Sequence, residues 1–296
     1  MYVGRFAPSP TGPLHFGSLV AAVASYLEAR KNKGRWLVRM EDLDKPREMA
    51  GAADGILSTL EAFGFEWDGA VLYQSNRQHA YAETLELLAN ADKVYACTCS
   101  RKEIADSAQH GIDGLVYPGT CRHGIAGEKT ARAWRLRTEN RRISVEDAIQ
   151  GHIEQDISRD IGDFVLKRAD GQFSYQLAVV TDDADQGITH IVRGADLLDS
   201  TPRQVYLQQL LGYPLPSYAH VPVVTNSEGE KLSKQTLAKA LDSGVKQHEL
   251  HRALAFLGQM PPGELWHHSL SDIWQWADAH WQLDSVPRQR NLQEAG

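Results

Sequence analysis

The first forty residues constrain the fold more than any other part of the chain. A short apolar segment at 2–6 is followed by a loop rich in proline and glycine at 7–17, and then by apolar residues at helical spacing. Gly34 ends this pattern, and a second apolar segment runs from 35 to 40. The order strand, loop, helix, strand predicts a βαβ unit, and therefore a parallel sheet covered by helices.

The remaining pattern predicts that this α/β domain is interrupted. Helical spacing continues at 53–63 and 78–89, whereas alternating residues at 133–137 and 163–167 indicate antiparallel strands. The α/β pattern returns with a strand at 188–193, a helix at 201–211 and a strand at 221–225. We expect a Rossmann-like α/β domain at 1–96 and 175–240, split by an α+β insertion at 97–174 and followed by a short α-helical part at 241–296.

Composition excludes several classes of protein. Lys and Arg number 31 against 38 Asp and Glu, so a nucleic-acid partner would need a local basic patch. The sequence has neither an apolar run long enough for a membrane span nor a secretory signal pattern. An odd, clustered set of three cysteines argues against a disulfide framework. We therefore expect a cytoplasmic protein that does not interact with membranes.

The loop at 7–17 has the properties of a phosphate site. Ligands of open α/β sheets bind beyond the carboxyl ends of strands, where this loop lies. Gly12 and Gly17 allow close approach of the backbone, the helix that follows presents free N–H groups, and His15 adds a directed hydrogen bond. The loop is neither a dinucleotide fingerprint nor a GxxxxGK[ST] loop. An ordinary βα loop with a chance histidine is the competing interpretation.

A second anion-binding pattern occurs far along the chain, at residues 230–235 (EKLSKQ). Lys231 and Lys234 flank a serine and can face one phosphate, although such charges alone are usually solvated surface. Together, His15-Phe16-Gly17-Ser18 and the KLSKQ segment resemble the HIGH and KMSKS signatures of class I aminoacyl-tRNA synthetases.

Five longer segments narrow the resemblance to glutamyl-tRNA synthetases. They are GRFAPSPTG at 4–12, RMEDLD at 39–44, DFVLKRADG at 163–171, YQLAVVTDD at 175–183 and GITHIVRGAD at 187–196. The resemblance runs almost continuously from residue 2 to about residue 240. It implies a class I catalytic domain that activates L-glutamate with ATP and Mg²⁺.

The resemblance also implies roles for individual residues. The glutamate pocket would consist of Arg5, Ala7, Ser9, Glu41, Tyr175 and Arg193. The ATP site would consist of His15, Gly17, Ser18, Lys231 and Lys234, with His15 and the two lysines as the catalytic groups. Two arginines and one glutamate suit a substrate with two carboxylates and one ammonium. Solvated side chains at strand ends are the alternative for the arginines.

The length of the chain after the KLSKQ segment bears on which RNA receives the activated glutamate. Bacterial glutamyl-tRNA synthetases carry a long helical anticodon-binding region after the KMSKS segment, and this sequence ends at Gly296. The chain therefore resembles the shortened paralogues of that family. This resemblance implies that the protein activates glutamate without tRNA and transfers it to the queuosine base at the wobble position, in the anticodon stem-loop of tRNA(Asp). We expect a monomer. The alternatives are charging of a tRNA 3′ end, a non-catalytic tRNA-binding paralogue, and a nucleotidyltransferase of the same fold.

The cysteines Cys97, Cys99 and Cys121 are candidates for a zinc site, since three thiolates and one further ligand suit tetrahedral Zn²⁺. Buried free thiols are the alternative. The family resemblance implies Tyr117 as the fourth ligand, with His123 as its competitor, and one structural ion.

Two further features remain open on sequence alone. The segment 129–142 is rich in basic residues and is either a tRNA contact or one exposed face of a sheet. Four tryptophans near the C-terminus either stack on bases or pack against the rest of the protein.

Overall fold

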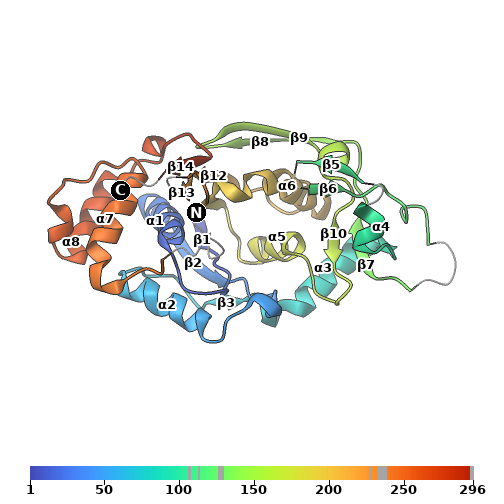
Figure 1. Cartoon of the computed structure of the whole chain (residues 1–296), viewed down its shortest axis with the longest axis horizontal. Helices are drawn as coiled ribbons and strands as arrows, with labels where there is room; N and C mark the ends of the chain where they lie inside the picture. Colours follow the sequence, from blue (N-terminus) through green and yellow to red (C-terminus); the bar gives the residue numbers. More distant parts are fainter. Residues whose placement is uncertain (106–107, 113, 126–129, 227, 232–238, 294–296) are drawn as a thin grey trace.

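A computed structural model of the whole chain describes residues 1–105, 108–112, 114–125, 130–226, 228–231 and 239–293. The molecule is elongated, with the C-terminal helices at one end, the inserted strands at the other, and the parallel sheet between them (Figure 1). This arrangement places the predicted phosphate loop at 7–17 in the central part.

The predicted βαβ unit is confirmed at the N-terminus. Strand β1 (Val3–Phe6) runs parallel to β2 (Arg35–Met40), and helix α1 (Phe16–Lys31) connects them. Strand β3 (Leu72–Tyr73) extends the sheet on the other side of β2. Helix α1 consists largely of small and aliphatic residues and is buried on most of its surface, because the sheet and the C-terminal helices cover it from different sides.

The second half of the parallel arrangement begins beside β1. Strand β11 (His190–Gly194) pairs in parallel with β12 (Ser217–Val221). The Thr189 amide donates to the carbonyl of Val3 at 2.9 Å, and β11 lies next to β1. The carboxyl ends of β1, β2, β11 and β12 therefore face a common region, which is where α/β sheets bind ligands.

Four helices continue the α/β pattern: α2 (Ala52–Ala62), α3 (Gln78–Asn90), α5 (Tyr175–Asp185) and α6 (Thr201–Leu211). The bounds of α6 coincide with the predicted ones. Pro202 lies in its first turn, and Gly212 ends it in the left-handed conformation with φ of 67°.

The inserted region is mostly antiparallel. Strands β4 (Val94–Cys97), β7 (Ala133–Leu136) and β10 (Val165–Lys167) form one sheet. Helix α4 (Arg101–Ala105) precedes a hairpin of β5 (Gln109–Gly111) and β6 (Gly114–Val116) in the chain. A second hairpin, β8 (Arg142–Asp147) and β9 (Gly151–Asp156), was not predicted. Strand β8 pairs with β12, so this hairpin connects the insertion to the parallel sheet.

Single turns link these elements. They are the 3₁₀ turns Lys45–Arg47, Gln74–Arg77, Ala195–Ser200, Ser243–Val245, Leu265–His267 and Leu283–Ser285, and the π turn Ile157–Ile161.

The C-terminal part packs against helix α1 through its helices α7 (Lys246–Phe256) and α8 (Leu270–His280). Trp281 is fully buried and donates from Nε1 to Glu28 at 2.6 Å. Trp274 donates to the carbonyl of Phe63 at 2.9 Å. These two tryptophans therefore serve packing rather than base stacking.

The predicted all-helical C-terminus ends instead in a strand. Strand β14 (Asn291–Gln293) pairs in parallel with β13 (Val223–Thr225), which follows β12 after Pro222. Within the described part of the chain, no helix has the length and apolarity needed to cross a membrane.

Candidate active site

A cavity of about 810 Å³ lies at the carboxyl ends of the parallel strands. Ten residues predicted for the glutamate and ATP sites line it: Arg5, Ala7, Ser9, His15, Gly17, Ser18, Glu41, Tyr175, Arg193 and Lys231. Lys234 lies outside the residues that the structure describes. Residues up to 226 positions apart in the sequence, from Arg5 to Lys231, thus meet around one space.

His15 is fixed at the start of α1. It caps the helix, and its Nδ1 accepts a hydrogen bond from the amide of Ser18 at 3.3 Å. The chain that follows the KLSKQ segment returns to this loop, because the Leu241 amide donates to Leu14 at 2.9 Å and Ala240 forms a β-bridge with His15. Residues 240 and 241 are therefore neighbours of the His15 loop in space, whereas residues 232–235 of the KLSKQ segment lie outside the described residues.

Lys231 enters the cavity wall from a short hairpin. A β-bridge joins it to Thr225, and the Asn226 amide donates to the carbonyl of Glu230 at 2.9 Å. Its Nζ lies 2.6 Å from Oδ2 of Asp196, the second residue after β11. This half-exposed ion pair places an ammonium group at the same rim as His15.

Arg5 is buried and held by a carboxylate. Its Nε and Nη2 donate to Asp183 at 3.1 and 3.3 Å, and Nη1 of Arg39 lies 2.8 Å from the same carboxylate. Asp183 is 4% exposed, and despite its burial the two guanidinium groups hold its pKa below the usual range. The orientation of Arg5 is thus set before any substrate binds.

Glu41 follows the end of β2 and lacks a close partner for one oxygen. Its Oε1 is buried and accepts no hydrogen bond from the described residues, and Nη2 of Arg39 is 3.6 Å away. Burial raises the pKa of Glu41 to about 7, although Arg39 and Arg5 act in the opposite direction. A buried carboxylate with an unsatisfied oxygen is a favourable site for a substrate ammonium.

Arg193, at the end of β11, faces the cavity from the other side. Its Nε donates to Nε2 of His220 at 3.0 Å, and its Nη2 donates to Thr201 and Gln204 at 2.9 and 2.8 Å. Its Nη1 is buried and has no hydrogen-bond partner among the described residues. One donor of this guanidinium is therefore left for a ligand.

Tyr175 and the β1–α1 loop complete the wall. Tyr175 is the first residue of α5, where Ser174 caps the helix, and burial raises the pKa of its hydroxyl. Ala7 and Ser9 lie in the loop, which is attached to the end of β2 by a hydrogen bond from the Glu41 amide to Pro8 at 3.0 Å.

Four buried residues that contact the cavity arginines directly or in turn were not singled out from the sequence: Arg39 and Asp183 beside Arg5, and His220 beside Arg193 with its partner Asp147 at 2.6 Å. Arg39 and Asp183 lie inside the motif segments RMEDLD and YQLAVVTDD, so their place in these segments was the signal that the sequence offered. Both side chains are buried in the structure. Asp147 and His220 belong to no motif.

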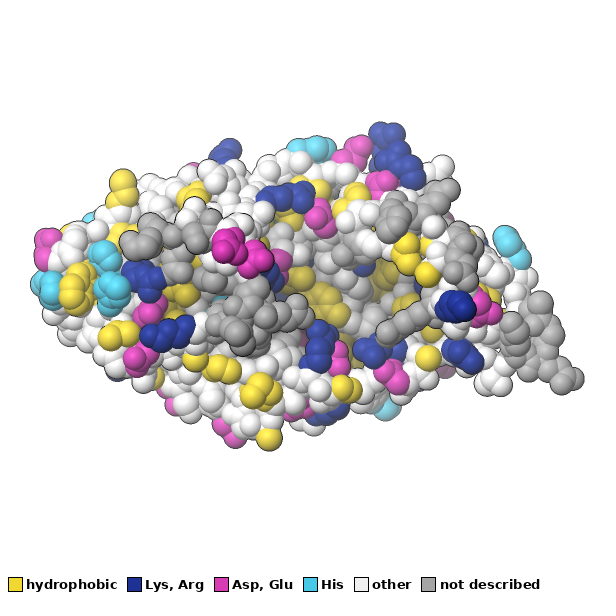
Figure 2. All heavy atoms as spheres, viewed as in Figure 1, with side chains coloured by type: hydrophobic (Ala, Val, Ile, Leu, Met, Phe, Trp, Pro, Cys, Tyr) yellow, Lys and Arg dark blue, Asp and Glu magenta, His cyan; other side chains and the backbone are white. Residues whose placement is uncertain are grey.

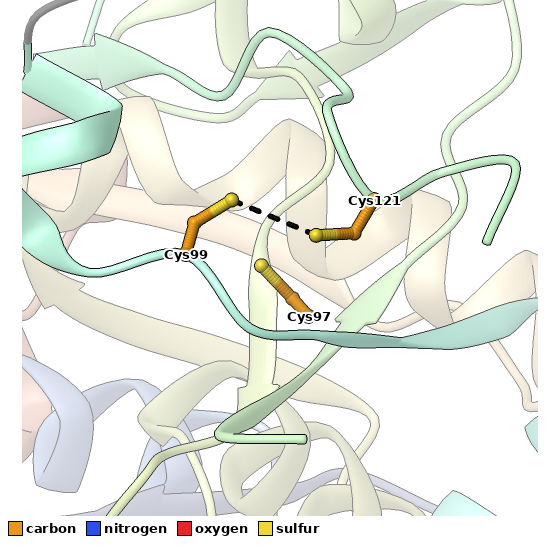
Figure 3. Close-up of side chains that lie close together, drawn as sticks. All are labelled: Cys97, Cys99 and Cys121. Atoms are coloured by element: carbon orange, nitrogen blue, oxygen red, sulfur yellow. Dashed lines mark hydrogen bonds between the residues drawn. The ribbon is translucent and has the colours of Figure 1, made fainter. Parts of the chain in front are cut away.

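The predicted zinc ligands form a cluster in the insertion. The Sγ atoms of Cys97, Cys99 and Cys121 lie within 4.8 Å of one another and point towards a common centre (Figure 3). The Tyr117 hydroxyl is 3.4 Å from the sulfurs of both Cys97 and Cys99 and accepts from the Cys121 amide at 2.9 Å. His123 is exposed and is not part of the cluster. Three thiols and a phenol thus fit a tetrahedral zinc site.

The basic segment 129–142 is partly committed to internal contacts. Arg135 is buried, and its guanidinium stacks on the Tyr117 ring at 3.8 Å. Arg137 donates to the carbonyl of Arg122 at 2.7 Å. Basic and acidic side chains are interspersed over the face shown in Figure 2. Lys129 lies outside the described residues, and among the described ones exposed Arg132 and Arg141 remain available to a phosphate backbone.

Comparison with known families gives one match over most of the chain. Residues 2–260 match the family described as tRNA synthetases class I (E and Q), catalytic domain. Several curated relatives have the name glutamyl-Q tRNA(Asp) synthetase. The relative from Dechloromonas aromatica is 62% identical and the match covers 97% of this chain and 96% of the relative. Those from Chromobacterium violaceum and Neisseria meningitidis are 58% and 57% identical, covering 97% of this chain and 96% and 98% of the relatives.

Two solved structures share the fold. A glutamate tRNA ligase from Elizabethkingia meningosepticum, in complex with its amino acid, superposes with a TM-score of 0.78 at 24% identity, covering 99% of this chain and 67% of the other. A glutamate-tRNA synthetase from Elizabethkingia anophelis gives a TM-score of 0.80 at 23% identity, with coverage of 99% and 68%. The predicted class I catalytic fold is thereby confirmed.

Proposed function

The chain belongs to the class I tRNA synthetases for E and Q, and from this premise we propose that it activates L-glutamate with ATP and transfers it to the queuosine base of tRNA(Asp). It is a ligase of the aminoacyl-tRNA synthetase type. The observation that carries the proposal is the single cavity in which the predicted glutamate and ATP residues meet.

The charges of the cavity match glutamate. Arg5 and Arg193 offer two guanidinium groups, one for each carboxylate, and Glu41 offers a carboxylate for the ammonium. All three are largely buried, so their interactions with a substrate are screened little by water.

The first step needs positioning and charge rather than a protein nucleophile. An oxygen of the glutamate α-carboxylate attacks the α-phosphorus of ATP, the α–β phosphoanhydride bond breaks, and pyrophosphate leaves. His15, the N–H groups at the start of α1, Lys231 and Lys234 would stabilise the charge that develops on the phosphates. Mg²⁺ entering with ATP would neutralise part of the same charge.

In the second step a hydroxyl of the acceptor attacks the acyl carbon of glutamyl-adenylate, an ester bond forms, and AMP leaves. The identity of the acceptor rests on the relatives named glutamyl-Q tRNA(Asp) synthetase, which the chain matches over nearly their whole length.

The decisive experiment offers labelled glutamate and ATP to three purified tRNAs: tRNA(Asp) with queuosine, tRNA(Asp) with guanine at the wobble position, and tRNA(Glu). We expect label only in the first. Label on both forms of tRNA(Asp), or on the 3′ end of tRNA(Glu), would overturn the proposed acceptor. Glutamate-dependent exchange of pyrophosphate into ATP without tRNA tests the first step separately.

We further propose that the cysteine cluster holds one structural Zn²⁺, with Tyr117 as the fourth ligand. The donor set supports this, because the phenol oxygen lies among three thiols while His123 is exposed. Bound zinc would favour the ionised forms of these ligands and fix β4 and the loop around Tyr117 together.

A further inference from the structure

A chain of buried side chains connects the insertion hairpin to the cavity. Asp147, the last residue of β8, contacts His220 of β12, which contacts Arg193 of β11. Asp147 and His220 are 5% and 0% exposed, and neither lines the cavity. The two residues are 73 positions apart, so the fold brings them together.

The geometry selects one tautomer of His220. Its Nδ1 lies 2.6 Å from Oδ2 of Asp147, which is an acceptor only, so Nδ1 carries the proton. Its Nε2 lies 3.0 Å from Nε of Arg193, which is a donor only, so Nε2 must be the acceptor. Burial lowers the pKa of His220 to about 4, which keeps the ring neutral as this arrangement requires.

The other oxygen of Asp147 is fully engaged. Oδ1 accepts from the amides of His220, Ile149 and Gln150 at 3.1, 3.0 and 2.8 Å. The carboxylate cannot turn without losing these bonds, so Oδ2 stays directed at the imidazole. The same contacts hold the β8–β9 turn.

We propose that Asp147 and His220 are positioning residues for glutamate binding: Asp147 keeps the proton of His220 on Nδ1, and the free Nε2 then holds Nε of Arg193. With Nε bound to His220 and Nη2 bound to Thr201 and Gln204, Nη1 remains as the donor for a substrate carboxylate. This inference rests on the proposed function, because the proposed function is what identifies glutamate as the ligand of Arg193.

The variant Asp147→Asn tests the tautomer. Its amide oxygen is expected at the Oδ1 position, where three N–H groups need an acceptor, which directs the amide NH₂ at Nδ1 of His220. Nδ1 must then accept, the proton moves to Nε2, and two donors face each other at Arg193. An imidazole held in the wrong tautomer retains its place and loses its function.

The partner variant is His220→Gln. Glutamine has no tautomers, and its carbonyl oxygen can accept from Nε of Arg193 near the position of Nε2. Combining it with Asp147→Asn gives a double-mutant cycle. If Asp147 acts through the tautomer of His220, the effects of the two substitutions on the KM for glutamate are not additive.

The readouts are the KM values for glutamate and for ATP in pyrophosphate exchange without tRNA, the melting temperature, and the ¹⁵N shifts of the His220 ring. For Asp147→Asn we expect the KM for glutamate to rise on the order of tenfold to a hundredfold, as for a misplaced binding group. The KM for ATP should stay unchanged, and the proton should appear on Nε2. In the His220→Gln background, Asp147→Asn should have little further effect.

An unchanged KM for glutamate in Asp147→Asn, or equal rises in both KM values with a lower melting temperature, would overturn the positioning role. A proton on Nε2 of His220 in the unaltered protein would overturn it as well. The absence of any glutamate-dependent exchange in the unaltered protein would instead overturn the proposed function.

Discussion

Arg5 and Asp183 form a buried, two-bond ion pair, with Nε and Nη2 of the arginine 3.1 and 3.3 Å from the two carboxylate oxygens. The pair joins β1 to α5 across 178 residues of sequence, and Arg39 adds a second guanidinium at 2.8 Å. The carboxylate therefore orients a cavity arginine and neutralises part of the charge of two buried cations.

The first prediction concerns this carboxylate. Asp183→Asn leaves Arg5 and Arg39 without their shared anion, and breaking a buried pair costs about 3–5 kcal/mol. We expect a loss of that order in the free energy of urea unfolding, together with a higher KM for glutamate. The control is Asp185→Asn in the same helix, where the carboxylate is 49% exposed and its pair with Arg77 is worth less than about 1 kcal/mol. Equal losses in the two variants would contradict the role of Asp183.

The second prediction concerns the pH dependence of glutamate binding. Burial raises the pKa of Glu41 to about 7, so the group is largely protonated below that pH and ionised above it. Only the ionised form attracts an ammonium, so kcat/KM for glutamate should rise with pH between about 6 and 8. Glu41→Gln should lower this value at high pH and remove the rise. A rise of the same size in Glu41→Gln would assign the titration to another group.

The third prediction tests the rim of the cavity. Lys231 pairs with Asp196 at 2.6 Å and stands beside the His15 loop. Losing one preorganised charge at a transferring phosphate costs on the order of 3 kcal/mol, or about a hundredfold in rate. We expect Lys231→Ala to slow pyrophosphate exchange by about that factor, measured at saturating glutamate. Lys31→Ala, at an exposed position at the end of α1, is the matched control. An unaffected rate in Lys231→Ala would show that the phosphates of ATP bind away from Lys231.

The fourth prediction is the metal content. Cys99→Ser should reduce bound zinc from about one ion per chain to almost none, because three thiols and a phenol make up the proposed donor set. His123→Ala should keep its zinc, since the imidazole is exposed outside the cluster. Tyr117→Phe keeps the ring under Arg135 and removes only the oxygen, so it should bind zinc more weakly. Zinc retained by Tyr117→Phe and lost by His123→Ala would reverse the assignment of the fourth ligand.

Sequence patterning predicted the elements that are regular and buried on a clear face. The order of β1, α1 and β2 followed from apolar periodicity, and α6 from helical spacing with proline and glycine at its ends. The cavity residues came from motifs that stand at strand ends, where the parallel sheet assembles them. These features depend on local sequence and on one rule, that α/β sheets bind their ligands at the carboxyl ends of the parallel strands.

The β8–β9 hairpin shows why other parts were missed. In β8 the buried positions alternate, but one of them is Asp147, and a charged residue interrupts an apolar pattern. Its burial depends on His220, 73 residues further on, and on three backbone amides. Strand β14 is only three residues long and exists through its pairing with β13. Such features depend on tertiary contacts that periodicity does not encode.

The last prediction follows from the same histidine. Burial lowers the pKa of His220 from 6.5 to about 4 in the folded protein, next to Asp147, Arg193 and the more distant Asp196. Between these values the unfolded chain binds a proton that the folded protein does not, so unfolding becomes easier as the pH falls. A shift of this size corresponds to about 3 kcal/mol, fully present as a loss below pH 4 and absent above pH 6.5.

We expect the free energy of urea unfolding to fall by an amount of this order as the pH drops from 7 to 4.5, beyond what the carboxylates contribute. His220→Gln cannot bind this proton, so its stability should depend less on pH over the same interval. The difference between the two curves isolates the histidine, because all other titrating groups are shared. Parallel curves would mean that the pKa of His220 is the same in the folded and unfolded chain, so that the folded ring gains a proton near pH 6.5 and then cannot accept the hydrogen bond from Arg193.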